Sequence, residues 1–217
     1  MPVINSTHKY QILHDHNIPL CFVGRSHYNS MLYSYFSETR HCIQITLEDL
    51  EKKSKQWLER YQFISLQTHV PFKIQVKKVF DRLNVKCFSV CSSFAAIGNN
   101  VSIGYNVVVE PFSSVWDDCV IGDFTTIACN VNIAHGASIG ECCHISPYAH
   151  LCYVECSDYV FVGNAAFVWA TKNSPIAVCN GVNIQAFSRV LKSIEQSGTY
   201  YSNRLVDART SIELTLQ

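Results

Sequence analysis

The chain has 217 residues, of which 48% are hydrophobic and 16% are charged, so a sizeable core can be buried and wholesale disorder is excluded. Its 17 Lys and Arg residues balance its 17 Asp and Glu residues, without the basic excess typical of nucleic-acid-binding proteins. The sequence contains neither an apolar run long enough for a transmembrane helix nor the apolar stretch of a signal peptide, so we expect a cytoplasmic protein with no membrane partner.

Residues 1–86 alternate between strand and helix patterns. A buried strand is predicted at 18–23 and a helix at 27–36. A capping box begins at Thr46 and starts a helical apolar face that runs to Tyr61. A second strand at 63–66 precedes a helix that Pro71 opens. This order predicts a small α/β domain.

The strongest signal in the sequence is an apolar residue at every sixth position. A small residue follows four positions after each of the first nine apolar residues, and a glycine often comes directly after the apolar residue, where we expect it to relieve backbone strain at a turn. The ten consecutive apolar positions are Ile97, Ile103, Val109, Val115, Ile121, Ile127, Ile133, Ile139, Ile145 and Leu151.

A period of six fits neither an α-helix nor a hairpin meander. Six residues suffice for a short strand and a sharp turn, and three such units close a triangular coil that stacks on the next at about 4.8 Å. This pattern is typical of the hexapeptide left-handed parallel β-helix. The left-handed twist is inferred from the known hexapeptide-repeat pattern, because the six-residue spacing alone does not determine handedness.

The repeat is interrupted twice. Its register slips after Leu151 and resumes at Cys156, and a loop is predicted at 171–175. We therefore expect an α/β domain over 1–86, a β-helix over 87–194 and a C-terminal tail over 195–217.

The chain has eleven cysteines but no C-x-x-C pair and no export signal. We expect reduced thiols acting as small core residues, without a disulfide framework or a metal site.

Charge is distributed unevenly along the repeat. Between Ile97 and Thr171 there is no Lys or Arg, and the cations return at Lys172, Arg189, Lys192, Arg204 and Arg209. Two interpretations stay open: a narrow solenoid has little room for long side chains, or a polyphosphate ligand binds at the C-terminal coils.

The segment Cys129-Asn-Val-Asn-Ile-Ala-His135-Gly-Ala-Ser-Ile-Gly140-Glu-Cys-Cys-His144-Ile-Ser-Pro-Tyr-Ala resembles the core motif of bacterial sugar acetyltransferases of the PglD/NeuD type. The resemblance implies a Rossmann-like domain before the β-helix and a homotrimer with active sites between subunits. It also implies acetyl-CoA as co-substrate and N-acetylation of a nucleotide-linked amino sugar for surface glycan synthesis.

Three other functions remain possible. A sugar O-acetyltransferase would use the same base, and a catalytically inactive trimeric scaffold would need none. A β-helical metalloenzyme of the carbonic anhydrase type would require His135, His144 and His150 to converge.

The resemblance also implies roles for individual residues. His135 matches the general base, because a neutral imidazole can take a proton from the attacking amine or hydroxyl. Its place in the hexad, two residues after inward Ile133, predicts that it faces outward. His144, also expected to face outward, matches a residue at the thioester end of acetyl-CoA. The backbone N–H of Tyr153 matches an oxyanion donor. Asn164 and Ala186 match positions that line the cofactor.

The chain departs from the family where a carboxylate normally follows the base, because Gly136 stands there. Eighteen residues before His135 and Gly136 lie Asp117 and Asp118. We hypothesise that one of them supplies the missing carboxylate from the adjacent coil. The alternative is that both aspartates simply occupy an exposed turn.

The family's glycine-rich nucleotide-binding turn is also altered, since residues 23–28 keep one glycine. Ser26 and His27 are candidate substrate-binding residues there. The aromatic residues Trp116 and Phe124, expected to be exposed, would suit a trimer interface.

Overall fold

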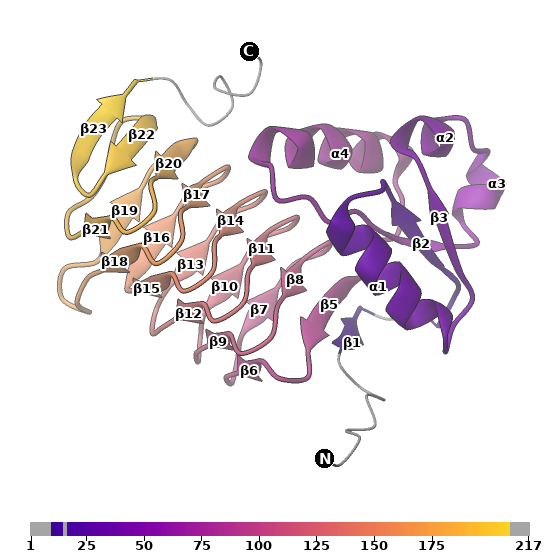
Figure 1. Ribbon diagram of the computed structural model, residues 1–217, viewed down its shortest axis with the longest axis horizontal. Helices are drawn as coiled ribbons and strands as arrows, with labels where there is room; N and C mark the ends of the chain where they lie inside the picture. Colours follow the sequence, from indigo (N-terminus) through magenta and orange to yellow (C-terminus); the bar gives the residue numbers. More distant parts are fainter. Residues whose placement is uncertain (1–9, 15–16, 209–217) are drawn as a thin grey trace.

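Short strands recur through most of the chain and stack as three parallel sheets around one apolar core, with an α/β unit at one end (Figure 1). The computed structural model describes residues 10–14 and 17–208. Along each coil the chain visits sheet 1, sheet 2 and sheet 3 in turn, so that consecutive strands belong to different sheets. We name the turns between them corner 1–2, corner 2–3 and corner 3–1.

Sheet 1 of the solenoid contains β5 (Ser89–Ser92), β8 (Val108–Val109), β11 (Thr126–Ile127), β14 (His144–Ile145), β17 (Phe161–Val162) and β20 (Val182–Ile184). Sheet 2 contains β6 (Ala96–Ile97), β9 (Ser114–Val115), β12 (Asn132–Ile133), β15 (His150–Cys152), β18 (Phe167–Trp169) and β21 (Arg189–Val190). Sheet 3 contains β7 (Ser102–Ile103), β10 (Val120–Ile121), β13 (Ser138–Ile139), β16 (Val154–Cys156) and β19 (Ile176–Val178).

The six-residue period predicted from the sequence is confirmed as one strand and one corner. Partner residues on adjacent coils are usually eighteen apart, as in Ile121 with Ile139. The register slip after Leu151 is a shorter coil, since Ile139 pairs with Cys156, and 156 − 139 = 17. The missing residue is lost at corner 2–3, where Tyr153 alone joins β15 to β16.

The recurring glycines serve a different purpose from the one expected. Gly98, Gly104, Gly122 and Gly140 are not among the residues with positive φ. A Cβ at Gly122 would lie 2.6 Å from the carbonyl carbon of Gly140, so the close approach of adjacent coils excludes a side chain. The left-handed backbone falls elsewhere, as at Asp118, Gly136 and Tyr153 on corner 2–3.

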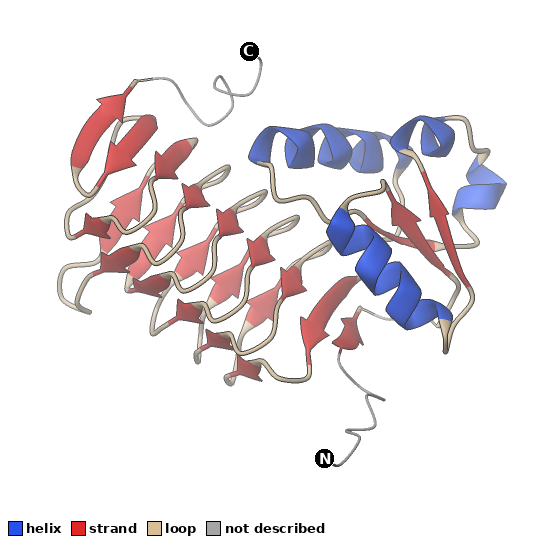
Figure 2. Cartoon of the chain, viewed as in Figure 1, coloured by secondary structure: helices blue, strands red, loops and turns tan. Residues whose placement is uncertain are grey.

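The α/β unit has a parallel sheet in the order β3-β2-β4, formed by β2 (Leu20–Val23), β3 (Cys42–Ile45) and β4 (Gln62–Ile64). Its helices are α1 (His27–Ser37), α2 (Leu47–Glu51), α3 (Lys55–Leu58) and α4 (Val70–Leu83) (Figure 2). The strand β3 was not predicted. The single helix expected from Thr46 to Tyr61 is two short helices, because Ser54 caps a new one.

Both ends of the described chain extend sheet 1. Strand β1 (Tyr10–Leu13) pairs antiparallel with β5, which belongs to the first coil. At the other end, β22 (Gly198–Tyr201) adds to β20 and turns back as β23 (Arg204–Asp207). The segment expected to be a tail is therefore a hairpin through Asp207, while 1–9 and 209–217 lie outside the described residues.

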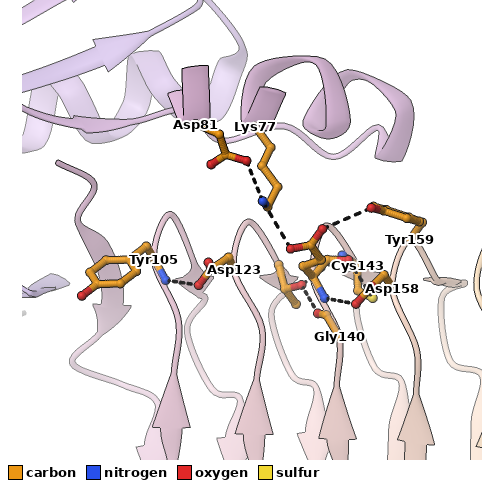
Figure 3. Close-up of polar contacts among 10 residues, drawn as sticks. Lys77, Asp81, Tyr105, Asp123, Gly140, Cys143, Asp158 and Tyr159 are labelled. Atoms are coloured by element: carbon orange, nitrogen blue, oxygen red, sulfur yellow. Dashed lines mark hydrogen bonds and ion pairs between the residues drawn. The ribbon is translucent and has the colours of Figure 1, made fainter. Parts of the chain in front are cut away.

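Helix α4 covers corner 3–1 of the solenoid (Figure 1). Phe80 packs edge-on against Phe124 at 5.7 Å, so Phe124 is buried rather than exposed as the sequence suggested. Lys73 is also buried, and its Nζ donates to the carbonyl oxygens of Phe124 and Cys143 and to Thr126 Oγ1. Lys77 forms an ion pair with Glu141 at 3.4 Å on the same corner (Figure 3).

The eleven cysteines are all free and most are buried in the cores. Within residues 10–14 and 17–208, no helix has the length and apolarity to cross a membrane.

Candidate functional site

The imidazole of His135 opens onto a groove at corner 2–3. Inward Ile133 and buried Ala137 fix the turn that holds His135, and Gly136 between them turns the chain at φ +63°. The side chain is therefore exposed, as the sequence predicted. The groove has a volume of about 570 Å³ and is lined by His135, Cys152, Tyr153, Trp169, Ala170, Thr171, Lys172 and Asn173.

Aromatic side chains from adjacent coils lie on either side of this imidazole. The Trp116 ring is centred 4.8 Å from it at 59°, and the Tyr153 ring lies 6.2 Å away at 27°. Among the described residues, no hydrogen bond or ion pair engages a ring nitrogen of His135. A neutral imidazole with a free nitrogen in an open groove can accept a proton from a bound nucleophile.

The backbone N–H of Tyr153 already has a partner. It donates to the carbonyl oxygen of His135 at 2.9 Å, and Tyr153 adopts φ +50°. Because this N–H already donates within corner 2–3, it is not available to the carbonyl oxygen of a thioester in this arrangement.

The structure does not join Asp117 or Asp118 to His135. Asp117 Oδ1 accepts the backbone N–H of Asn99 at 2.6 Å, and Asp118 Oδ1 accepts from Asn100 Nδ2 at 3.2 Å. Both partners belong to the preceding coil, on the side away from His135. The hypothesis that either carboxylate orients the base gains no support from this geometry.

The contact made by Asp117 recurs at two other places on the solenoid. Asp123 Oδ1 accepts the N–H of Tyr105 at 2.8 Å, and Asp158 Oδ1 accepts the N–H of Glu141 at 2.9 Å (Figure 3). In each case the carboxylate also lies against the glycine that precedes the donor, which leaves no room for a Cβ. These aspartates link one coil to the next, and Asp117 belongs to this group.

His144 is not exposed, contrary to the expectation. It lies on β14 of sheet 1, stacks on Phe161 with centroids 5.4 Å apart, and is 6% exposed because the α/β unit covers this face. Its Nδ1 has no hydrogen-bond partner within residues 10–14 and 17–208. Burial, together with the nearby Lys73 ammonium, lowers the pKa of His144 from 6.5 to about 3.

The remaining predicted residues lie away from the groove. Asn164 and Ala186 are exposed neighbours at corner 1–2, where Phe187 N–H donates to the carbonyl oxygen of Asn164. Ser26 is the N-cap of α1: its hydroxyl accepts from Asn29 N–H and donates to the carbonyl oxygen of Leu66. His27 is exposed at the first turn of that helix.

The three histidines of a carbonic-anhydrase-type centre do not converge. His135 is at corner 2–3, His144 is buried on sheet 1 and His150 lies on sheet 2 against Phe167. In the part of the chain that the structure describes, no group of three or more His, Cys, Asp or Glu side chains is placed to hold a metal ion.

The sequence analysis named Tyr153 and Lys172, which line the groove, but it did not predict that Lys172 lies near His135 or that aromatic rings flank the imidazole. The expected loop is present, with a bridge between Thr171 and Ser174, and it brings Lys172 to the same groove as His135. The coil length of about eighteen residues could have predicted that Trp116 and Tyr153 flank His135, because they lie 19 residues before it and 18 residues after it.

Comparison with known proteins supports the same architecture. Residues 118–152 match a family model described as bacterial transferase hexapeptide (six repeats). WeeI from Acinetobacter baumannii AYE aligns with a TM-score of 0.74 at 16% identity, over 86% of this chain and 97% of that chain. The acetyltransferase domain of PglB from Neisseria gonorrhoeae FA1090 aligns with a TM-score of 0.70 at 16% identity, over 83% and 95%.

PerB from Caulobacter crescentus, solved in complex with CoA and GDP-perosamine, aligns with a TM-score of 0.55 at 15% identity, over 89% of this chain and 92% of that chain. These likenesses show a shared fold. The predicted fold class, an α/β unit followed by a left-handed parallel β-helix of hexapeptide repeats, is confirmed.

Proposed function

We propose that this protein is an acetyl-CoA-dependent N-acetyltransferase that acts on a nucleotide-linked amino sugar, with His135 as its general base. The observation that carries the proposal is the exposed imidazole, free at its ring nitrogens among the described residues, on a groove of about 570 Å³. That volume lies within the range of small-molecule sites. The structural neighbours include an acetyltransferase domain and a protein solved with CoA and GDP-perosamine, which supports the same chemistry.

The chemistry needs one proton acceptor beside a bound thioester. The acceptor amine attacks the acetyl carbonyl carbon, a C–N bond forms, and the amine proton moves to the free nitrogen of His135. The C–S bond then breaks, and the proton passes from the imidazolium to the departing CoA thiolate. His135 returns to its neutral form, so the protein is unchanged after one turnover.

The cations near the groove suit a phosphate-bearing substrate. Lys172 lines the groove with His135, and no Lys or Arg occurs between Ile97 and Thr171. Arg189 and Lys192 follow on the next coil. An ammonium at this position can pair with a phosphate of CoA or of a nucleotide-linked sugar, which supports the interpretation of the charge pattern as functional.

We also propose that the active protein is a homotrimer. Aromatic side chains project into solvent along corner 1–2, where a single chain leaves them uncovered: Phe94, Phe112, Tyr148 and Phe187. A ridge of this kind is typical of a surface that another subunit covers. An assembly would also bring Asn164 and Ala186 of one subunit closer to a groove on its neighbour.

The test is a thiol-release assay with acetyl-CoA and a panel of UDP-, dTDP- and GDP-linked amino sugars, with mass spectrometry of the products. The proposal predicts CoA release that depends on one amino sugar and a product heavier by one acetyl group on nitrogen. Transfer only to hydroxyl groups would instead favour the O-acetyltransferase. Absence of transfer to every acceptor would favour the inactive scaffold.

A further inference from the structure

In the described part of the chain, His135 has no carboxylate partner of the kind that commonly orients a catalytic imidazole. Gly136 follows it and carries no side chain, and the carboxylates of Asp117 and Asp118 are engaged with the preceding coil. A general base works only if its nitrogen is directed at the proton it removes. Among the described residues, ring packing is the contact that can limit rotation of the His135 side chain.

Trp116 and Tyr153 lie where they can limit rotation of the His135 ring. They come from the coils before and after it, so the imidazole is enclosed on opposite sides along the stacking direction of the solenoid. Trp116 meets it at a tilted angle with centroids 4.8 Å apart, within the range of favourable aromatic contacts. Tyr153 is closer to parallel, at 27°.

Tyr153 is held in place by the backbone as well as by packing. It is the single residue of its corner, and its N–H donates to the carbonyl oxygen of His135. A Cβ at position 136 would lie 2.9 Å from Tyr153 Cδ1, so the ring of Tyr153 fills the space that a side chain at 136 would need. The glycine after the base and the tyrosine of the next coil therefore form one packing unit.

We propose that Trp116 and Tyr153 are positioning residues that clamp the imidazole of His135 in its working orientation, in place of a carboxylate. The proposal rests on the function proposed above, because it assigns these residues to the same base. Neither ring exchanges a proton in the reaction. Their effect is to restrict the imidazole to the orientation that faces the groove.

The experiment compares Trp116→Leu, Trp116→Phe and Asp118→Asn in the full-length protein. Leucine removes the aromatic face while keeping an apolar side chain, and phenylalanine restores it. The clamp predicts that Trp116→Leu lowers kcat by about 10- to 100-fold while KM for acetyl-CoA changes by less than about 3-fold. It predicts that Trp116→Phe keeps kcat within about 3-fold of the wild type.

The control Asp118→Asn removes a charge from the same corner without touching His135. The clamp predicts an unchanged kcat and an unchanged pH profile of kcat/KM for this variant. A shifted profile would show that a carboxylate does orient the base and would overturn the clamp. Normal kcat in Trp116→Leu, or a rise in KM alone, would also overturn it.

A second readout does not depend on turnover. The indole ring current shifts the NMR signals of the His135 ring protons, and the clamp predicts that this shift is present in the wild type and lost in Trp116→Leu. Its absence from the wild type would overturn the clamp. Failure of the proposed function is distinguishable, because it appears as a protein with the ring-current shift but no acetyl transfer, or as a His135→Ala variant that keeps full activity.

Discussion

At corner 2–3 the carboxylate of Asp117 accepts a backbone N–H from the preceding coil, and Asp123 and Asp158 do the same at corner 3–1. A charged acceptor that satisfies a turn N–H is worth more than an ordinary hydrogen bond. Asp117 and His135 occupy equivalent positions on adjacent coils. The same position of the repeat can therefore carry a residue with a structural role in one coil and a residue with a proposed chemical role in the next.

This argument gives a stability prediction for Asp123, which lies outside the groove. Asp123→Ala should lower the free energy of unfolding by about 1 kcal/mol, since the solvent-exposed Tyr105 N–H loses its charged acceptor. Urea unfolding measures the change. The control is Asp118→Ala, which loses a contact with the side-chain amide of Asn100 instead of a backbone N–H and should cost less than about 0.5 kcal/mol. Equal effects in both variants would contradict the structural role.

At the scale of elements, α4 determines what the solenoid leaves exposed. Its Lys73 has three hydrogen-bond acceptors for the three N–H groups of an ammonium, although burial lowers the pKa of this lysine to about 7. From its place over corner 3–1, the helix brings Lys73 to Thr126 on sheet 1 and close to His144. His144 is buried for that reason.

Burial of neutral His144 predicts a pH dependence of stability. Its folded pKa is about 3 against 6.5 for an ordinary histidine, so the unfolded chain binds more protons between these values. Stability should therefore fall as the pH is lowered from 6.5 towards 3. His144→Phe keeps the stacking on Phe161 and should remove this part of the loss. The contribution of Lys73 lies above pH 7 and does not overlap.

The measurement is urea unfolding of the wild type and His144→Phe at several pH values. The advantage of the variant should grow as the pH falls below 6.5. A constant difference between the two proteins would show that His144 is accessible to protons in the folded state.

The solenoid was predictable because its signal is local and repeated. Each inward aliphatic residue reports the same strand, and the slip in the period after Leu151 corresponds to the shorter coil. The α/β unit was harder, because β3 is a short strand whose side chains are only half buried. The burial of Phe124 and His144 depends on the docking of α4, a long-range contact that no period in the sequence reports.

In the candidate site too, local features could be predicted from the sequence, whereas the partners of individual side chains could not. The outward direction of His135 was predicted from its place in the hexad, two residues after inward Ile133, and it is confirmed. The partners of the Asp117 and Asp118 carboxylates did not follow, because coil spacing fixes which residues are neighbours but not towards which neighbour a side chain turns. The roles of the predicted residues remain predictions.

At the scale of the whole molecule, the exposed aromatic ridge of corner 1–2 predicts self-association. Phe112 is 66% exposed, and its ring lies against that of Phe94 on the preceding coil. Phe112→Ser should weaken the proposed trimer while leaving the monomer folded, since the side chain contributes little to the core. Sedimentation velocity measures the change, and Met31→Ser on the α/β unit is a control. An unchanged sedimentation coefficient for the Phe112 variant would place the interface elsewhere.

The charge distribution gives a second prediction at this scale. Lys172→Gln removes the cation of the groove and keeps a long polar side chain, so it should raise KM for acetyl-CoA or for the sugar nucleotide by about 10-fold while kcat changes little. Steady-state kinetics with each substrate varied in turn identifies which one pairs with Lys172. An unchanged KM for both substrates would contradict a phosphate contact.

The most direct measurement is the rate of acetyl transfer by His135→Ala, taken together with the affinity of the same variant for CoA by calorimetry. The account predicts that transfer falls by about 100- to 10,000-fold, the range attributed to general bases, while CoA binds as it does to the wild type. Transfer at the wild-type rate, with CoA still bound, would contradict the assignment of the base and the mechanism that depends on it.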